Sequence, residues 1–251
     1  MTNLDSIVSQ RSFWNQWNAS TREHTFQDVS QRQTEVVCGW LEGLCRNDLD
    51  IIDAGCGTGW LCPKLLRFGH VTGTDLSDEV LSRAQQREPR VKYIAGDFFG
   101  IDFEDASFDV VVTLELLTHV ADQAALMRKF ARMLRPGGHL MLATQNRTVV
   151  ERYNTVSPPA KGQLRRWVDE AELRNLLQPH FDVLELFSVT PRANRGPMRI
   201  VNSYKLNMLI RAIVGERLEN IKERMGLGWT LMALAERRAP RASPQTSLDL
   251  E

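Results

Sequence analysis

The clearest signal in the sequence is the segment Ile51-Ile52-Asp53-Ala54-Gly55-Cys56-Gly57-Thr58-Gly59-Trp60. An apolar run passes here into a loop with glycine at every second position, and a helical pattern follows at once. Glycines in such a turn let the backbone approach a ligand closely and leave amide groups of the helix start pointing at it. The stretch predicts a strand, a ligand-binding turn and a helix, although a turn without a ligand has the same outline.

The spacing of the glycines narrows the choice of ligand. A dinucleotide-binding fingerprint needs its third glycine three places after the second, but Trp60 stands there and the third glycine is Gly59. No Lys-Ser or Lys-Thr pair stands where a phosphate-binding P-loop requires one. We therefore expect a ligand other than a nicotinamide dinucleotide.

Short apolar runs alternate with helical stretches from residue 49 onward. This alternation predicts βαβ units, and hence an α/β fold with a mostly parallel sheet and helices on both faces. The predicted strands cover 49–54, 70–74, 91–95, 108–114, 139–144, 181–189 and 229–235, and the predicted helices between them cover 60–68, 80–87, 121–134 and 169–177. The run Arg135-Pro136-Gly137-Gly138 predicts a helix stop and a turn into the fifth strand.

We expect a single domain over residues 1–240 and a disordered tail over 241–251, which is rich in Pro, Ser and Gln. Within the domain, 1–48 is predicted to form a helical prologue or lid of two helices, and 49–145 a cofactor-binding core. Residues 146–240 are expected to form the acceptor side. They include a helical insertion at 191–227, which is expected to determine specificity or, alternatively, to make a dimer contact.

Acidic residues end the second and third predicted strands, as Asp53 ends the first. Asp75 comes twenty-two residues after Asp53, at a position where a carboxylate can accept both hydroxyls of a ribose. Asp97 is followed by the aromatic ring of Phe98. Three acids along one sheet edge are hard to explain by packing alone, so they favour a bound ligand.

Together these residues resemble the class I S-adenosylmethionine-dependent methyltransferases. The resemblance is strong over residues 50–142, where Asp53, Gly55, Gly57 and Gly59 match the first motif. It implies a Rossmann-like, seven-stranded sheet with one antiparallel strand, and S-adenosylmethionine as cofactor over the carboxyl ends of the first four strands.

The resemblance also implies roles for individual residues. Gly55 and the carbonyl of Leu114 would hold the ammonium of the methionine moiety. Asp75 would hold the ribose and Leu76 would pack on the adenine. At the end of the third strand, the carboxylate of Asp97 would accept a hydrogen bond from the adenine amino group, and the ring of Phe98 would cap the base.

The stretch from Leu114 to Asp122 looks like the corresponding stretch of the ubiquinone-pathway O-methyltransferases and related small-molecule enzymes, where a histidine stands at the position of His119. His119 is therefore the candidate general base for a hydroxyl acceptor. Alternatively it is a structural residue bonded to backbone or to Glu115. Part of that group binds a metal with two glutamates and the histidine, but Thr118 replaces the second glutamate, so no metal is expected.

The acceptor side has a basic bias, with twelve basic and seven acidic residues from Arg147 to Arg217. Arginine forks bind oxyanions in a bidentate manner, which suits an acceptor with a carboxylate or phosphate. Solvated helix faces and surface ion pairs are the alternative for most of these arginines. In the prologue, Phe13, Trp14 and Trp17 either close over the sulfonium through cation-π contacts or pack on the sheet.

Composition excludes several other functions. Basic and acidic residues number 31 each, so no global field attracts nucleic acid or a membrane surface. The four cysteines, Cys38, Cys45, Cys56 and Cys62, lack zinc-site spacing and read as reduced thiols of a cytoplasmic protein. We expect O-methylation of a small biosynthetic metabolite by in-line transfer, and the chain could form a homodimer. The alternatives are an N- or C-methyltransferase, an RNA methyltransferase, or a cofactor-binding regulatory subunit without catalysis.

Overall fold

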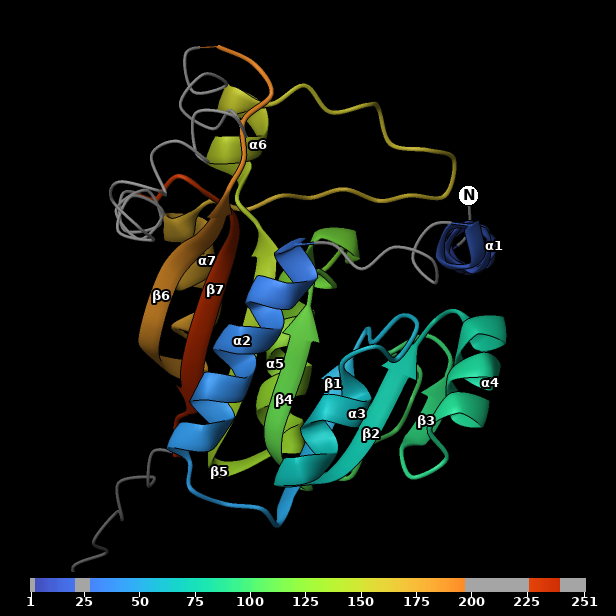
Figure 1. Ribbon diagram of the computed structural model, residues 1–251, viewed down its shortest axis with the longest axis vertical. Coiled ribbons are helices and arrows are strands. Elements are labelled where there is room, and N and C mark those ends of the chain that lie inside the picture. Colours follow the sequence, from blue (N-terminus) through green and yellow to red (C-terminus); the bar gives the residue numbers. More distant parts are fainter. Residues whose placement is uncertain (1–2, 21–27, 197–225, 240–251) are drawn as a thin grey trace, which may run out of the picture.

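The computed structural model describes residues 3–20, 28–196 and 226–239 (Figure 1). Seven strands form one sheet: β1 (Leu49–Ala54), β2 (Gly69–Asp75), β3 (Lys92–Ala95), β4 (Phe108–Leu114), β5 (Leu134–Gln145), β6 (Phe181–Pro191) and β7 (Gly228–Arg237). Their order is β3-β2-β1-β4-β5-β7-β6. β7 runs antiparallel to both of its neighbours, whereas the pairings among β1 to β5 are parallel. The predicted Rossmann-like sheet with one antiparallel strand is confirmed.

Helices cover both faces of the sheet. They are α1 (Asn3–Ser20), α2 (Asp28–Gly43), α3 (Cys62–Leu65), α4 (Asp78–Arg87), α5 (Gln123–Met133), α6 (Arg147–Tyr153) and α7 (Glu170–Leu177). Successive strand residues point to opposite faces, so Ile51 and Val110 pack with α2 and α3, while Ile52 and Val111 pack with α5 and α7 (Figure 1). All four side chains are fully buried, which is why these strands read as continuous apolar runs in the sequence.

Capping residues set the starts of two predicted helices. Asp122 accepts a hydrogen bond from the amide of Ala125 at 2.8 Å, so α5 begins just after it. Asp169 and Glu172 form a capping box, in which each side chain accepts from the other residue's amide. The predicted helices at 121–134 and 169–177 are thus confirmed within two residues at each end.

The structure corrects two local predictions and adds one short helix. The predicted helix at 60–68 is reduced to α3 and a 3-10 turn, η2 (Leu66–Phe68), because Pro63 fits only the first turn of a helix. The predicted turn at 135–138 lies inside β5, where pairing with β4 jumps from Leu134 to His139. The short helix α6 was not predicted, since seven residues carry too little periodicity to be recognised.

Helix α1 and the irregular segment 154–168 cover the carboxyl ends of β1 to β4. Asn15 of α1 accepts a hydrogen bond from the Ser77 hydroxyl at 2.5 Å and donates one to Asp78 at 3.0 Å. The irregular segment 154–168 crosses from α6 toward α1 (Figure 1), and Gly162 lies so close to Ser9 that a Cβ on Gly162 would come within 2.6 Å of its carbonyl oxygen. The two predicted prologue helices are confirmed as α1 and α2.

Two predictions fall on residues that the structure does not describe. Most of the expected insertion at 191–227 lies within 197–225, and the expected tail at 241–251 lies beyond 239. Among the described helices, none is both long and apolar enough to cross a membrane.

Candidate active site

A cavity of about 720 Å³ lies at the carboxyl ends of the parallel strands. Its wall combines the strand ends, α1, the 3-10 turn η3 (Leu117–His119) and the segment 154–168. Most of the predicted site residues line it, namely Gly55, Gly57, Asp75, Leu76, Asp97, Phe98, Leu114 and His119. Asp53 and Gly59 do not line it and lie in the layer behind. One cavity thus joins the predicted cofactor residues to the predicted base.

The glycine loop is held by backbone hydrogen bonds and by close contacts. The amides of Gly55 and Cys56 donate to the carbonyl of Thr74 at 2.8 and 2.9 Å, which ties the loop to the end of β2. Gly55 has a φ of +76°, and a Cβ there would lie 3.0 Å from the Cβ of Leu116. A side chain at this position would therefore be strained and would push into the residues after β4.

Gly59→Ala is expected to lower the free energy of unfolding by ~2 kcal/mol or more. Gly59 has a φ of +69°, and a Cβ would lie 2.6 Å from the hydroxyl oxygen of Tyr93. The matched control is Gly39→Ala in the middle of α2, where a Cβ meets nothing within 4 Å. That change is expected to stabilise the protein by ~0.5–1 kcal/mol. Urea denaturation of both variants measures the difference, and equal effects would contradict the assigned loop geometry.

Asp75 ends β2 with both carboxylate oxygens oriented by the backbone. One oxygen accepts from the amide of Gly57 at 2.8 Å, and the other accepts from the amide of Ser77 at 2.9 Å. Burial raises the pKa of Asp75 above its usual value, and these amide bonds oppose that rise. Each oxygen keeps a second lone pair for a ligand, so the carboxylate can hold the glycine loop and accept hydroxyl hydrogen bonds together.

Asp53 lies behind the loop, with only 2% of its surface exposed. Burial raises its pKa to about 7, and the Cys62 thiol, 3.5 Å from its carboxylate oxygen, lowers it in part. Cys56 is also buried, and all four cysteines of the chain are free thiols. The Asp53 carboxylate therefore lies against the Cys62 thiol of α3, behind the glycine loop, and does not line the cavity.

The end of β3 contributes a carboxylate and two aromatic rings. Asp97 accepts a hydrogen bond from the amide of Phe99 at 3.2 Å. Phe98 reaches the cavity wall but is 9% exposed, and its ring packs on Phe103 and Phe130 at centroid distances of 5.7 and 5.5 Å. Phe99 also lines the cavity and is 42% exposed. Sequence reasoning missed Phe99, although its place beside Phe98 was a usable signal.

His119 is oriented by the segment above it. Its Nδ1 lies 2.7 Å from the carbonyl oxygen of Leu164. Since a carbonyl only accepts, the neutral ring carries its proton on Nδ1 and its lone pair on Nε2. Burial lowers the pKa of His119, the bond to Leu164 raises it, and Arg165 lowers it further. The ring is thus neutral near pH 7 and suited to accept a proton at Nε2.

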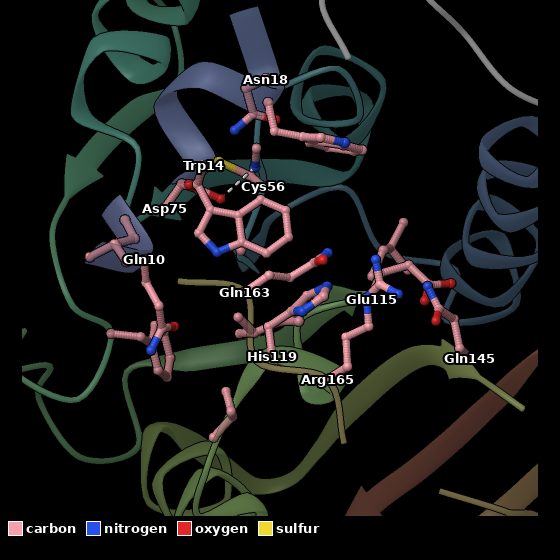
Figure 2. Close-up of a pocket in the computed structure, with 18 of the residues that line it drawn as sticks. Gln10, Trp14, Asn18, Cys56, Asp75, Glu115, His119, Gln145, Gln163 and Arg165 are labelled. Atoms are coloured by element: carbon pink, nitrogen blue, oxygen red, sulfur yellow. Dashed lines mark hydrogen bonds between the residues drawn. The ribbon is translucent and has the colours of Figure 1, made fainter. Parts of the chain in front are cut away.

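Trp14 of α1 lies against His119. Their ring centroids are 4.5 Å apart in an edge-to-face arrangement. Figure 2 shows the Trp14 indole between the side chains of Asp75 and His119. Of the three prologue aromatic residues, Trp14 and Trp17 line the cavity, and Trp14 contacts the ring of His119.

Glu115 was considered as a hydrogen-bond partner of His119, but its carboxylate binds other residues. It has a φ of +70° and directs its carboxylate away from the imidazole, where Oε1 accepts from Gln33 at 2.7 Å and from Thr230 at 3.3 Å. These bonds tie the end of β4 to α2 and β7.

The cavity wall around His119 contains polar side chains whose proximity the sequence did not predict. Trp167 donates from its indole nitrogen to Gln145 at 2.7 Å, which fixes the plane of its ring. Gln163 also lines the cavity here, whereas Asn18 lies beside the glycine loop, where its Oδ1 would be 3.7 Å from a Cβ on Gly57. No sequence motif marked either residue. Arg165 lies beside His119, and both are labelled in Figure 2.

Comparison with known proteins agrees with this geometry. Residues 52–142 match the family model described as a methyltransferase domain. A ubiquinone biosynthesis O-methyltransferase of Xanthomonas oryzae is 38% identical over 151 residues, which cover 58% of this chain and 61% of that protein. A probable S-adenosylmethionine-dependent methyltransferase of Mycolicibacterium smegmatis is 33% identical over 152 residues, covering 59% and 56%. The matched part thus spans less than two thirds of either relative.

A solved structure shares the fold over most of its length. The 1,6-didemethyltoxoflavin-N1-methyltransferase of Burkholderia thailandensis, solved with its substrate and S-adenosylhomocysteine, has a TM-score of 0.61 and 20% sequence identity. The match covers 95% of this chain and 92% of that one. With the sheet order, the glycine loop and the acidic strand ends, these matches show that residues 52–142 match the methyltransferase domain family and that the chain has the fold of the class I S-adenosylmethionine-dependent methyltransferases.

Proposed function

We propose that this chain transfers the methyl group of S-adenosylmethionine to a hydroxyl oxygen of a small biosynthetic metabolite. The observation that carries the proposal is the orientation of His119. Its Nδ1 is committed to the Leu164 carbonyl, which leaves Nε2 as a base in the same cavity as the glycine loop and Asp75. The ubiquinone O-methyltransferase relatives support a hydroxyl acceptor.

The residues of the cavity fit the cofactor. A volume of about 720 Å³ is in the range of small-molecule sites. The positive φ of Gly55 and the space that a Cβ there would fill indicate a backbone cradle. When bound, S-adenosylmethionine supplies an electrophilic methyl group on a sulfonium. Asp75 is assigned to the ribose hydroxyls, and Gly55 with the Leu114 carbonyl to the ammonium.

The adenine is assigned to the end of β3. In this assignment Asp97 accepts from the amino group, while Leu76 and Phe98 contact the base. All three residues line the cavity, and Phe99 adds an exposed ring beside them. Few polar groups are needed here, because shape and apolar contact contribute most to the binding of a flat base.

His119 is assigned as the general base. Its Nε2 accepts the proton of the acceptor hydroxyl as that oxygen becomes the nucleophile, while the Nδ1 bond to Leu164 holds the ring in place. Helix α1 is assigned to exclude water and to position the acceptor. These two effects make the larger part of a protein's contribution to methyl transfer. The π-face of Trp14 is assigned to contact the sulfonium beside His119.

Methyl-labelled S-adenosylmethionine tests the proposal directly. The protein is incubated with the label and with either the ultrafiltered small molecules or the purified RNA of its own cells. We expect label in a small molecule, in an alkali-stable ether rather than an alkali-labile ester. Label confined to RNA would identify the RNA methyltransferase alternative. No transfer to any fraction, with cofactor binding intact, would favour the regulatory subunit.

Turnover is expected to survive exhaustive chelation by EDTA. The Thr118 hydroxyl is fully buried and lies 3.1 Å from the hydroxyl of Thr144, and a hydroxyl is a poor ligand for a hard cation. Across the described ranges, no group of three His, Cys, Asp or Glu side chains is placed to hold a metal. Loss of turnover with EDTA and its recovery with magnesium or zinc would contradict this prediction.

A further inference from the structure

The described arginines of the predicted acceptor side are of two kinds, because some pair with carboxylates while others, such as Arg165 and Arg166, donate to backbone carbonyls, and of these two only Arg165 lines the cavity. Arg147, for example, is balanced by both Asp169 and Glu172, with its Nη1 2.6 Å from Glu172. For Arg165, by contrast, the one hydrogen bond that we find runs from Nη1 to the carbonyl oxygen of Ser157 at 2.6 Å. No described carboxylate forms an ion pair with it. Surface ion pairing therefore explains Arg147 but leaves Arg165 unexplained.

The backbone on both sides of Arg165 is fixed. The Leu164 carbonyl binds His119, and the Arg166 amide donates to the Thr118 carbonyl at 2.8 Å. The Arg166 carbonyl accepts from Gln123 at 2.8 Å. These bonds dock the segment on η3, so the Arg165 side chain is held on the cavity wall beside the imidazole (Figure 2).

The charge of Arg165 acts inside the cavity. Partial burial lowers its pKa without an opposing carboxylate, and its charge lowers the pKa of His119. A guanidinium in a partly buried site without a counter-ion is unfavourable, because lost hydration is not replaced. An anionic group of a ligand would replace the lost hydration. The planar guanidinium can bind a carboxylate through two parallel hydrogen bonds.

We propose that Arg165 is the specificity-determining residue for the acceptor, and that the acceptor is a hydroxy acid whose carboxylate binds the Arg165 guanidinium while its hydroxyl faces His119. Trp14, which contacts the His119 ring, and Trp167 line the same cavity, and these aromatic side chains favour an aromatic hydroxy acid. This inference rests on the proposed function, since it names the substrate class of the same cavity.

Calorimetry with matched probes tests the proposal. The 2-, 3- and 4-hydroxybenzoates are compared with the corresponding hydroxybenzamides, which keep the ring and the hydroxyl but lack the charge. Each is titrated into the full chain, both free and saturated with S-adenosylhomocysteine. We expect at least one hydroxybenzoate to bind tenfold or more tightly than its amide. Inorganic phosphate, titrated alone, is expected to bind more weakly than that hydroxybenzoate.

Three variants locate the effect. Arg165→Ala is expected to abolish the preference for the carboxylate, and Arg165→Lys to keep part of it, because lysine retains the charge without the fork. The control is Arg166→Ala, which removes the same charge from an exposed neighbour that does not line the cavity. It is expected to keep the full preference. Thermal denaturation of each variant verifies that it is folded.

The possible outcomes separate this inference from the proposed function. Equal binding of carboxylates and amides, no binding of any hydroxybenzoate, or an undiminished preference in Arg165→Ala would each overturn the role of Arg165. Phosphate binding as tight as the best hydroxybenzoate would identify a general anion site and would also overturn it. Failure of S-adenosylhomocysteine to bind would instead count against the proposed function, while the probe titrations on the free chain still report on Arg165.

Discussion

Asp75→Ala is expected to weaken the binding of S-adenosylhomocysteine about tenfold to a hundredfold, or ~1.5–3 kcal/mol. The substitution removes the assigned partner of two ribose hydroxyls. It also removes the acceptor that holds the amide of Gly57 at 2.8 Å, so the glycine loop loses one of its supports. Isothermal titration calorimetry measures the change.

Two further variants separate these contributions. Asp75→Asn keeps one acceptor oxygen and is expected to fall between wild type and Asp75→Ala. Glu79→Ala removes the same charge from an exposed position in the first turn of α4 and is expected to leave the affinity unchanged. If wild type and Asp75→Ala bound with equal affinity, the ribose assignment would be wrong.

His119→Ala is expected to lower kcat about 100-fold or more for a hydroxyl acceptor, because a positioned general base contributes about 10²–10⁴-fold. The assay needs an acceptor identified by the labelling experiment. In the wild type, kcat/KM is expected to rise with pH through the pKa of His119 and then to level off. Burial places that pKa below its usual value, so the plateau is expected to include pH 7.

The pH profile distinguishes a base from a structural residue. In His119→Ala the acidic limb is expected to disappear, whereas loss of a merely structural histidine would scale the whole profile without changing its shape. The matched variant Trp14→Phe keeps an aromatic ring against His119 and is expected to retain the limb. A loss below threefold in folded His119→Ala would assign the residue to structure and favour a nitrogen, carbon or already ionised acceptor.

The sequence predicted the sheet well because of where its strands are buried. Ile51, Ile52, Val110 and Val111 are inaccessible on both faces of the sheet, so the strands appear as unbroken apolar runs. The first residue of a helix was also predictable where a capping side chain fixes it, as Asp169 does for α7. Local sequence therefore carries the information for these elements.

Other parts depend on contacts between distant segments. The pairing of Leu134 with Phe108 extends β5 before its apolar run begins, and no local pattern marks that contact. In the same way, the bond between His119 and the Leu164 carbonyl joins residues 45 positions apart. The chemistry of the predicted base could be named from the sequence, but its tautomer follows only from the tertiary structure.

The residues assigned to the cofactor were more predictable than those assigned to the acceptor. Gly55, Gly57 and Asp75 lie at the ends of adjacent strands, where the topology of a parallel sheet brings them together. Arg165 and Gln163 lie on the irregular segment 154–168, whose path across the cavity is set by its contacts with α1 and η3. Their proximity to His119 could not be predicted from periodicity or spacing.

Two titrations, one with S-adenosylhomocysteine and one with NADH, test whether the cavity binds S-adenosylmethionine, because they show which ligand the glycine loop and Asp75 accept. We predict one molecule of S-adenosylhomocysteine bound per chain with a micromolar dissociation constant and no measurable heat with NADH. Binding of NADH, or the absence of S-adenosylhomocysteine binding by a folded protein, would contradict the assignment of this cavity to S-adenosylmethionine.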